Sequence, residues 1–598
     1  MLLILRLKPK AKRIKALKGK FGQKHKRGKV KTMVDVLKTV ICALNSKYVH
    51  SSLAPWYLAA AVDRHCAGKV QAEVVEGTIN EQVEAVAERI RAQKPDVVGV
   101  SCYIWNIAAT LELVRLIKAW MPPVTVVLGG PEVSFNAAEI LKAEPLVDYI
   151  IAGEGEKPFA LFLNALVQAK SLDKIPGLCY RKGNEIVTSA PYLTTEEPPD
   201  PYTEKYLAAL AGRMAYLETS RGCPFKCAFC LSGNYGKVRF FALEEAEKRM
   251  LLLANSGTQT IKLVDRTFNA NRKRAARLFR FIIENYGTKI PPGVCFHFEM
   301  GGDLLDEETI ELLATAPPGA IQFEIGIQSF NPQTLAAIKR KTDLERLKNN
   351  IQRILAPQNI HVHLDLIAGL PHEDLQSFQE SFNTAYLLQP HTLQLGFLKV
   401  LWGTPMRDDP QKYPALYKKE PPYEVIATPW LSAEEINLLH QVEDAVNRLY
   451  NSGRFRRTLQ YVLKQTGAAP FALFRGIGEF CAQHNLKHIA LDDYTTLVFT
   501  YFKGQPGVEE KVLRDIMVCD RLATNASGRL PKVLQVYDPA LKKLSKKMTA
   551  LVPPPPGIRR GYALLYSENC LVYADYKEKN PVTGEYKLFK RKLPLKGK

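Results

Sequence analysis

The sequence predicts an α/β protein with a doubly wound, Rossmann-like (flavodoxin-like) domain, a partial (β/α)6 barrel and a mainly helical C-terminal domain. Three observations support this prediction. Val- and Ile-rich segments alternate with amphipathic segments over residues 36–160, and the alternation resumes over residues 214–401. Buried strands between helices are typical of parallel sheets that helices cover on both faces. Beyond residue 431, helical patterns dominate.

The doubly wound domain is expected over residues 34–168. Its predicted strands lie at residues 39–45, 70–77, 96–103, 125–130 and 148–156, and its predicted helices at residues 51–66, 80–93, 109–120 and 137–144. Sheets of this kind bind ligands at the carboxyl ends of their strands. Residues 169–212 are expected to form a hairpin, with Gly183 in its turn, and a proline-rich linker.

The second block of alternation predicts six strand–helix units over residues 213–430. Strands are expected at residues 215–222, 260–268, 294–302, 320–330, 361–371 and 392–401, and helices at residues 242–255, 272–286, 306–315, 332–339, 343–355 and 374–387. These six units are shorter than the roughly 250 residues of a full eightfold barrel, so we expect a partial one.

The last region, residues 431–598, is expected to be a separate domain of mainly helical structure. Ser432, followed three residues later by Glu435, predicts a capped helix start. Residues 559–576 predict two strands, which a basic tail follows. No chemistry follows from these residues.

The net charge of +22 comes mainly from the two ends of the chain. Residues 1–31 hold thirteen Lys or Arg and no acid, and residues 577–598 hold eight Lys or Arg and two Glu. We interpret residues 1–33 as a disordered basic extension, with Met33 as an alternative first residue. The other interpretation is that these ends contact nucleic acid or an anionic membrane surface. A membrane span is not predicted, because every apolar run is shorter than about 18 residues.

Three of the eleven cysteines, Cys223, Cys227 and Cys230, follow a predicted strand with the spacing C-x3-C-x2-C. A four-iron cluster needs four ligands, so three local thiolates would leave one iron open to another molecule. A zinc site is the alternative, but its fourth ligand would have to come from Cys295 or His297, far along the chain. The other eight cysteines are scattered, mostly in apolar segments, which favours reduced thiols in a cytoplasmic protein.

The cysteine motif, with SRGCP at residues 220–224 and Phe229 before the last cysteine, resembles the radical S-adenosylmethionine (SAM) superfamily. The resemblance implies that the three cysteines hold a 4Fe-4S cluster whose open iron binds SAM. It implies that reductive cleavage of SAM gives a 5′-deoxyadenosyl radical. An electron donor such as flavodoxin or ferredoxin is implied as a partner.

Segments downstream extend this resemblance. Residues 264–269 (VDRTFN), 324–340 (EIGIQSFNPQTLAAIKR) and 364–371 (LDLIAGLP) are similar to strand motifs of the superfamily, the last two to its coproporphyrinogen-oxidase-like branch. The residues that would contact SAM by this similarity are Phe229, Glu299, Gln328, Arg340 and Asp365. The chemistry is suitable, because an arginine can bind the carboxylate of SAM and acids can accept from its hydroxyls and ammonium. The alternative is that each polar residue only caps the helix after its strand.

The domain ahead of the barrel resembles the cobalamin-binding module of B12-dependent radical SAM enzymes. The resemblance rests on residues 43–54, 98–106, 127–135 and 152–159. It implies that loops after the strands contact cobalamin, partly through glycines that let the backbone approach closely. The implied contact residues are Ser101, Gly129, Gly130, Gly153 and Glu154. A degenerate domain that binds no cobalamin is the alternative.

Residues 63–68 match the string D-x-H-x-x-G, which supplies a cobalt-ligating histidine in mutases and methionine synthase. In those proteins the string follows the first strand. Here it ends the first predicted helix, at the opposite edge of the sheet. We therefore interpret His65 as a helix C-terminal residue that interacts with the helix dipole.

The sequence therefore predicts a radical SAM enzyme that carries out cobalamin-dependent methyl transfer, or a related radical modification, on an unidentified substrate. Two alternatives stay open. One is a cobalamin-free radical SAM enzyme, for example one that modifies RNA, which the basic ends alone favour. The other is a non-catalytic iron–sulfur sensor. No catalytic residue beyond the cluster is predicted.

Overall fold

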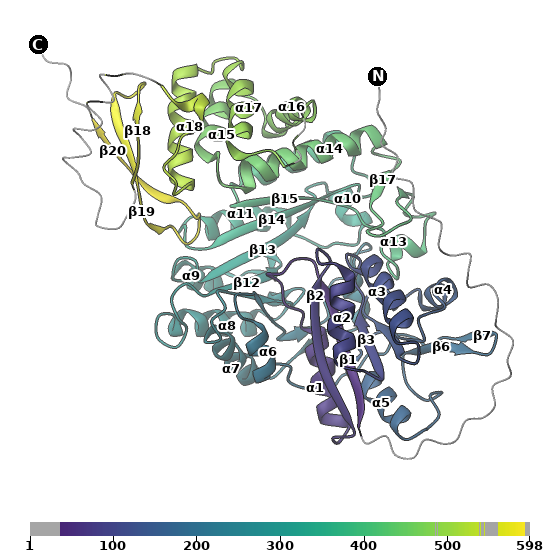
Figure 1. Cartoon of the computed structure of the whole chain (residues 1–598). Helices are drawn as coiled ribbons and strands as arrows, with labels where there is room; N and C mark the ends of the chain where they lie inside the picture. Colours follow the sequence, from purple (N-terminus) through teal and green to yellow (C-terminus); the bar gives the residue numbers. More distant parts are fainter. Residues whose placement is uncertain are drawn as a thin grey trace, which may run out of the picture.

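The computed structural model describes residues 36–592, except positions 485, 487, 537, 538, 540–542 and 544–559. The basic extension expected at residues 1–33 lies outside the described residues. Figure 1 shows the first domain in purple and blue beside the teal barrel, with the green helices of the C-terminal region on the other side of the barrel. No helix in the described part of the chain is long and apolar enough to cross a membrane.

The first sheet has the strand order β2-β1-β3-β4-β5-β6-β7. Its strands are β1 (Leu37–Asn45), β2 (Val70–Thr78), β3 (Val97–Ser101), β4 (Thr125–Gly129), β5 (Tyr149–Ile151), β6 (Leu178–Lys182) and β7 (Glu185–Val187). Its helices are α1 (Ala54–His65), α2 (Val83–Ala92), α3 (Ile107–Trp120), α4 (Ala137–Ala143) and α5 (Glu156–Val167). Strands β1 to β5 run parallel, and their 2-1-3-4-5 order confirms the flavodoxin-like prediction.

Two features of this domain were not predicted. Helix α5 follows β5 directly, and Phe159, Phe162 and Leu163 bury its inner side. The predicted hairpin does form with Gly183 in its turn, but β6 pairs antiparallel with β5 and so extends the first sheet. The short helix α6 (Glu204–Ala209) then leads to the barrel.

The second large sheet has the order β15-β14-β13-β12-β11-β8, and all its strands run parallel. Its strands are β8 (Ala215–Leu217), β11 (Thr260–Leu263), β12 (Cys295–Met300), β13 (Ile321–Gln328), β14 (His361–Ala368) and β15 (Thr392–Phe397). Its helices are α7 (Leu243–Ala254), α8 (Arg272–Asn285), α9 (Glu307–Ala314), α10 (Pro332–Ala337), α11 (Leu344–Leu355) and α12 (Leu375–Leu387). The predicted partial (β/α)6 barrel is confirmed.

The barrel strands separate apolar from polar side chains. Phe296, Phe298 and Phe323 are fully buried in the core beneath the helices. The alternate positions on β12 and β13, such as His297 and Glu324, point to the other face because side chains alternate along a strand. The interior of this open barrel is therefore polar.

The C-terminal region is mainly helical, as predicted, and ends in a three-stranded sheet. Its elements are α14 (Ala433–Ala445), the π-helical turn η4 (Val446–Asn451), α15 (Arg456–Thr466), α16 (Pro470–Ala482), α17 (Leu491–Lys503), α18 (Glu510–Thr524), β18 (Arg560–Leu565), β19 (Cys570–Lys579) and β20 (Tyr586–Lys592). Ser432 and Glu435 form the predicted capping box. Residues 586–592 were expected to belong to a basic tail, but they form strand β20. The four cations of this segment obscured the strand pattern in the sequence.

This region covers an edge and one end of the barrel. The Asn451 side chain accepts from the backbone N–H of Leu393 at 2.9 Å and donates to its carbonyl at 2.9 Å. It thereby pairs the backbone N–H and C=O of Leu393 on the edge strand β15, where such groups would otherwise be unpaired. His361 Nδ1, at the start of β14, lies 3.0 Å from the Val582 carbonyl, so the β19–β20 turn covers the amino end of the barrel.

A buried carboxylate fixes the loops at the carboxyl end of the barrel. Glu373 is fully buried and accepts from Ser329 Oγ at 2.5 Å and from Ser381 Oγ at 3.1 Å. Its second oxygen has no hydrogen-bond partner. Burial raises the pKa of Glu373 to about 7, although the two serines oppose the shift.

We expect Glu373→Gln to remove a pH-dependent loss of stability. A carboxyl whose folded-state pKa is raised stabilises the fold fully only below its unfolded-state pKa, and this contribution is lost as the pH rises through about 7. Urea unfolding measures this effect. Between pH 5 and pH 8, the free energy of unfolding of the wild type should fall by about 2–3 kcal/mol relative to that of the variant. Glu380→Gln, at an exposed position of α12, is the control. Parallel pH profiles for wild type and Glu373→Gln would contradict this interpretation.

Candidate functional site

The cysteine loop begins where β8 ends, and Asp265 fixes its first residues. This carboxylate follows β11 and accepts from the Thr219 N–H at 2.9 Å, from Thr219 Oγ1 at 2.7 Å and from Ser220 Oγ at 2.5 Å. Burial raises the pKa of Asp265 to about 6. A short antiparallel pairing of β9 (Ser220–Arg221) with β10 (Arg239–Phe240) then sets the direction of the loop.

The three cysteines lie on this loop at the carboxyl end of the barrel. Cys223 Sγ lies 3.3 Å from Thr267 Oγ1, and Cys230 Sγ accepts from the Ser232 N–H at 3.4 Å. Burial raises the pKa of the Cys227 thiol, and the charge and hydrogen bond of Arg340 oppose this shift. Among the described residues, no group of three side chains is arranged to hold a single metal ion. A four-iron cluster spreads its thiolate ligands over several irons, and the loop stays a candidate for such a cluster.

Arg340 and Gln328 are brought to the cysteine loop. Arg340 Nη1 donates to Cys227 Sγ at 3.8 Å, and its Nη2 donates to the Gly326 carbonyl. Its Nε and Gln328 Oε1 are buried without a hydrogen-bond partner. Gln328 also has a left-handed backbone, with φ of 76°, which is uncommon for a residue other than glycine. Unpaired buried groups of this kind suit a polar ligand beside the cysteines.

The other expected SAM contacts lie in the polar interior or beside the loop. Lys262 Nζ lies 3.4 Å from Glu299 Oε1 and 2.9 Å from Glu324 Oε2, so Glu299 already has a cationic partner. Asp365 Oδ1 lies 3.0 Å from His363 Nε2, and burial raises the pKa of this carboxyl. Phe229 is half-buried against the barrel core. The SAM-binding roles of these three residues stay predictions.

The Glu324 carboxylate joins this interior network. His297 Nε2 lies 2.8 Å from Glu324 Oε2. Burial raises the pKa of Glu324, but the His297 hydrogen bond and the Lys262 charge hold it well below its usual range. The network therefore places fixed charges in the interior of the barrel. His297, one of the possible zinc ligands, is engaged with Glu324 instead.

A buried ion cluster, which the sequence analysis missed, connects the cysteine loop to the first domain. Arg221 lies between three carboxylates: Nη1 is 3.1 Å from Glu154 Oε2, Nη2 is 2.9 Å from Glu156 Oε1, and Nη2 is 2.8 Å from Glu218 Oε2. Arg239 also pairs with Glu154. We call these five residues the Arg221 cluster. The only sequence signal for it was the acidic GEGE segment after β5.

The cobalamin contacts expected in the first domain lie at the carboxyl edge of its sheet. Ser101 Oγ donates to the Cys42 carbonyl at 3.3 Å, and the Glu154 carboxylate belongs to the Arg221 cluster, so both side chains have partners within the protein. The three glycines lie beside them. Gly130 and Gly153 have φ of 105° and 91°, and a Cβ atom would collide with the Cys102 carbonyl at 2.5 Å and with the Tyr192 carbonyl at 2.3 Å, respectively. Gly129 has looser surroundings, with the nearest atom at 3.5 Å. Contacts of all five residues with cobalamin stay predictions.

His65 is the last residue of α1, and its carbonyl accepts from Asn164 Nδ2 at 3.0 Å. It therefore lies at the helix end, as interpreted from the sequence, and not on a loop that follows a strand.

An aromatic pair follows β3, at the same edge of the first sheet. The rings of Tyr103 and Trp105 stack with centroids 4.4 Å apart, and Trp105 is 48% exposed. Arg266, on the loop after β11, has its Nη1 3.4 Å from Glu299 Oε2, and its side chain is 55% exposed. Residues 98–106 carry part of the cobalamin-module resemblance, but no sequence pattern distinguished these two rings.

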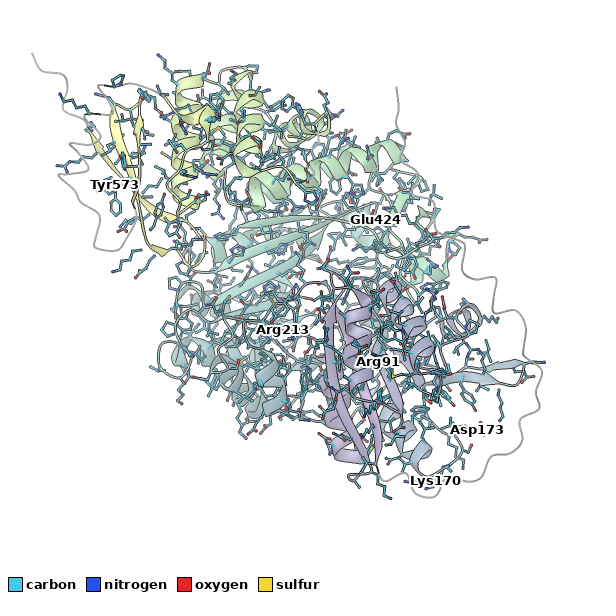
Figure 2. All side chains as sticks on the ribbon, in the orientation of Figure 1. Arg91, Lys170, Asp173, Arg213, Glu424 and Tyr573 are labelled. Atoms are coloured by element: carbon cyan, nitrogen blue, oxygen red, sulfur yellow. The ribbon has the colours of Figure 1, made fainter. Side chains whose placement is uncertain are left out.

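Arg213 and Glu76 join the first domain to the barrel at the amino end of β8. Arg213 Nη2 lies 2.6 Å from Glu76 Oε2, and both side chains are almost fully buried. Figure 2 shows Arg213 between the first domain and the barrel. The Tyr48 carbonyl accepts from Arg213 Nε at 3.1 Å, so the loop after β1 is also held against the barrel.

Three consecutive parts of the chain match family models. Residues 39–163 match the B12 binding domain, residues 217–385 match the Radical SAM superfamily, and residues 411–552 match a protein family of unknown function, DUF4080. These matches confirm the expected family resemblance and the order of its parts. They also support the expected cofactors: a 4Fe-4S cluster, SAM and cobalamin.

The chain is similar to several curated proteins over about half its length. It is 27% identical to the cobalamin-dependent radical SAM methyltransferase TokK of Streptomyces tokunonensis, over 49% of this chain and 45% of that protein. It is 28% identical to the 2-(S-pantetheinyl)-carbapenam-3-carboxylate methyltransferase of Streptantibioticus cattleyicolor, over 48% of this chain and 44% of that protein. The chain thus spans less than half the length of these two relatives.

Solved structures share the fold. OxsB, determined with aqua-cobalamin and SAM bound, has a TM-score of 0.56 at 14% identity and covers 87% of this chain and 81% of its own. TsrM from Kitasatospora setae, determined with cobalamin and a [4Fe-4S] cluster bound, has a TM-score of 0.52 at 18% identity, over 61% of this chain and 73% of its own.

We expect Arg221→Met to destabilise the protein strongly. The substitution leaves three carboxylates without their shared cation, and breaking a buried ion pair costs about 3–5 kcal/mol. Arg91→Met is the control, because Arg91 forms an exposed pair with Glu88, whose loss should cost at most about 1 kcal/mol. Thermal unfolding of the two variants measures the difference. Equal melting temperatures would show that the Arg221 cluster does not stabilise the domain interface.

Proposed function

We propose that this chain, which combines a B12 binding domain, a radical SAM domain and a DUF4080 region, is a cobalamin-dependent radical SAM enzyme. In this proposal, its reaction is the transfer of a methyl group to an unidentified substrate. The single observation that supports this most strongly is the position of Arg340 between Cys227 and the Gly326 carbonyl. A guanidinium there can bind the carboxylate of a SAM molecule whose amino acid end lies at the open iron.

When bound, the cluster would supply the electron that breaks the SAM sulfonium, and cobalamin would supply the methyl group. In this proposal, Cys223, Cys227 and Cys230 ligate the cluster. Arg340 holds the SAM carboxylate, and the unpaired Gln328 Oε1 accepts a hydrogen bond from a donor of the ligand. Asp265 holds Thr219 and Ser220, which begin the loop that carries the cysteines.

Cobalamin binding is supported by the family match and by the surface of the first domain. The carboxyl edge of its sheet adjoins the cysteine loop, because Glu154, which follows β5, pairs with Arg221. The Trp105 ring is half-exposed there and offers a flat apolar contact for a large planar macrocycle. A corrin at this edge would lie beside the SAM site.

Two alternatives differ from this proposal: a radical SAM reaction other than methyl transfer, and an enzyme that uses no cobalamin. Relatives of this chain include the anaerobic magnesium-protoporphyrin IX monomethyl ester cyclase of Cereibacter sphaeroides, which is 25% identical over 51% of this chain, so the family resemblance alone does not fix methyl transfer. A cobalamin-free enzyme would retain SAM cleavage without binding corrin. A flavodoxin or ferredoxin as electron donor, and a cytoplasmic location consistent with eleven free cysteines, belong to the same proposal.

We expect Cys227→Ala to lose the cluster and Arg340→Ala to keep it. Anaerobically reconstituted wild type and Arg340→Ala should each hold four irons per chain, and Cys227→Ala should hold far less. Release of 5′-deoxyadenosine with dithionite should occur in wild type and be lost in Cys227→Ala. In Arg340→Ala the KM for SAM should rise about tenfold or more, because one charge-assisted contact is removed. Cys295→Ala is the matched control. Full iron content in Cys227→Ala would contradict the assigned ligand.

Corrin binding distinguishes a cobalamin-dependent radical SAM enzyme from a cobalamin-free one. After anaerobic incubation with hydroxocobalamin and desalting, the wild-type chain should retain stoichiometric corrin, measured by absorbance. Trp105→Ala should retain less, and Trp120→Ala, on the same domain, should retain as much as the wild type. SAM cleavage without any retained corrin would favour the cobalamin-free enzyme.

A further inference from the structure

The C-terminal sheet carries a surface that the proposed radical chemistry does not use. The strand order is β18-β19-β20, and both pairings are antiparallel. One face packs on α18, where Ala563 and Val572 are buried and a Cβ on Gly561 would meet Leu522 at 2.8 Å. The alternate side chains project from the other face, because the direction alternates along each strand.

Three aromatic side chains form a row across that other face. Tyr562 is paired with Tyr573 in the sheet register, and Tyr573 is paired with Phe589. The Tyr573 and Phe589 rings stack with centroids 5.3 Å apart and planes 16° apart, and Tyr562 is 40% exposed. Figure 2 shows Tyr573 on this sheet, at the opposite end of the molecule from Lys170. We call these three residues the aromatic row.

Cations border the aromatic row. Lys587 and Arg591 lie two residues on either side of Phe589 on β20, so they project from the same face. Lys587 Nζ lies 5.2 Å from the Phe589 ring centroid. Asp575, opposite Lys587 in the register, is the acid of this face within the described strands. Strand β20 as a whole carries four cations and no acid.

Edge protection explains only part of this pattern. Lysines on an edge strand prevent the strand from pairing with another chain, and β20 is an edge strand. That role needs no stacked aromatic rings on the solvent side of the sheet. Aromatic rings on a strand face beside cations are the arrangement that binds bases by stacking and phosphates by charge.

We propose that this face binds single-stranded nucleic acid, with bases stacked on the aromatic row and phosphates held by Lys587 and Arg591. Single strands are favoured because the bases of a duplex are already stacked and cannot lie on the rings. The inference does not rest on the proposed SAM chemistry. The sheet adjoins the amino end of the barrel through the Val582 contact, so the face is a docking surface and not part of the cysteine site.

The test measures binding of a short labelled oligouridylate to the full chain by fluorescence anisotropy over a range of salt concentrations. We expect Tyr562→Leu/Phe589→Leu to bind about 5- to 100-fold more weakly at every salt concentration, because leucine keeps the strand packing and removes the stacking surface. We expect Lys587→Gln/Arg591→Gln to reduce the slope of log K against log salt by about 1.4, the value for two lost phosphate contacts on a single strand.

Two comparisons keep this test specific. Lys170→Gln/Lys174→Gln removes the same charge from exposed positions of the first domain and should leave the affinity unchanged. The basic residues 1–31 are present in every protein compared, so only differences between variants are interpreted. An unlabelled duplex should compete more weakly than the single strand. Equal binding by wild type and Tyr562→Leu/Phe589→Leu, with both proteins folded by circular dichroism, would overturn the proposal. Equal competition by the duplex would also overturn the proposal. The same holds if the sheet binds protein partners and no oligonucleotide.

Discussion

The buried charge of Arg221 is the interaction on which the candidate site depends. Its side chain is 15% exposed, and a guanidinium so enclosed is costly unless carboxylates compensate it. One of those carboxylates, Glu218, belongs to the cysteine loop, while Glu154 and Glu156 belong to the first domain. Formation of the loop and docking of the first domain are therefore coupled. A substitution in the loop after β5 should therefore affect Arg221, which lies two residues before Cys223.

The open barrel explains why three domains are needed. Its six strands leave β8 and β15 as edges with free backbone groups. The first domain covers β8, because Met214 donates to the Val49 carbonyl at 2.8 Å and His50 Nδ1 lies 2.7 Å from Tyr216 Oη. The C-terminal region covers β15 through Asn451. The polar interior is thus enclosed from both sides, and its carboxyl end faces the first domain.

Much of the fold followed from periodicity, because buried parallel strands and amphipathic helices have distinct patterns. Helix α5 was missed because its glycine-rich approach resembled a turn, and β20 was missed because its lysines resembled a disordered tail. The site was predictable only where local spacing reports chemistry, as for the cysteines. The Arg221 cluster joins residues up to 85 positions apart, since Arg239 contacts Glu154, and no local pattern reveals such a pairing. Likewise, only the structure shows that Glu299 is paired with Lys262.

The central claim is that SAM binds at the open iron of a cluster on the cysteine loop. Low-temperature electron paramagnetic resonance of the anaerobically reduced, reconstituted chain, with and without SAM, tests this most directly. SAM should change the g-values of the reduced cluster, because it becomes a ligand of one iron. An intact cluster signal that SAM leaves unchanged at saturating concentration would contradict the claim.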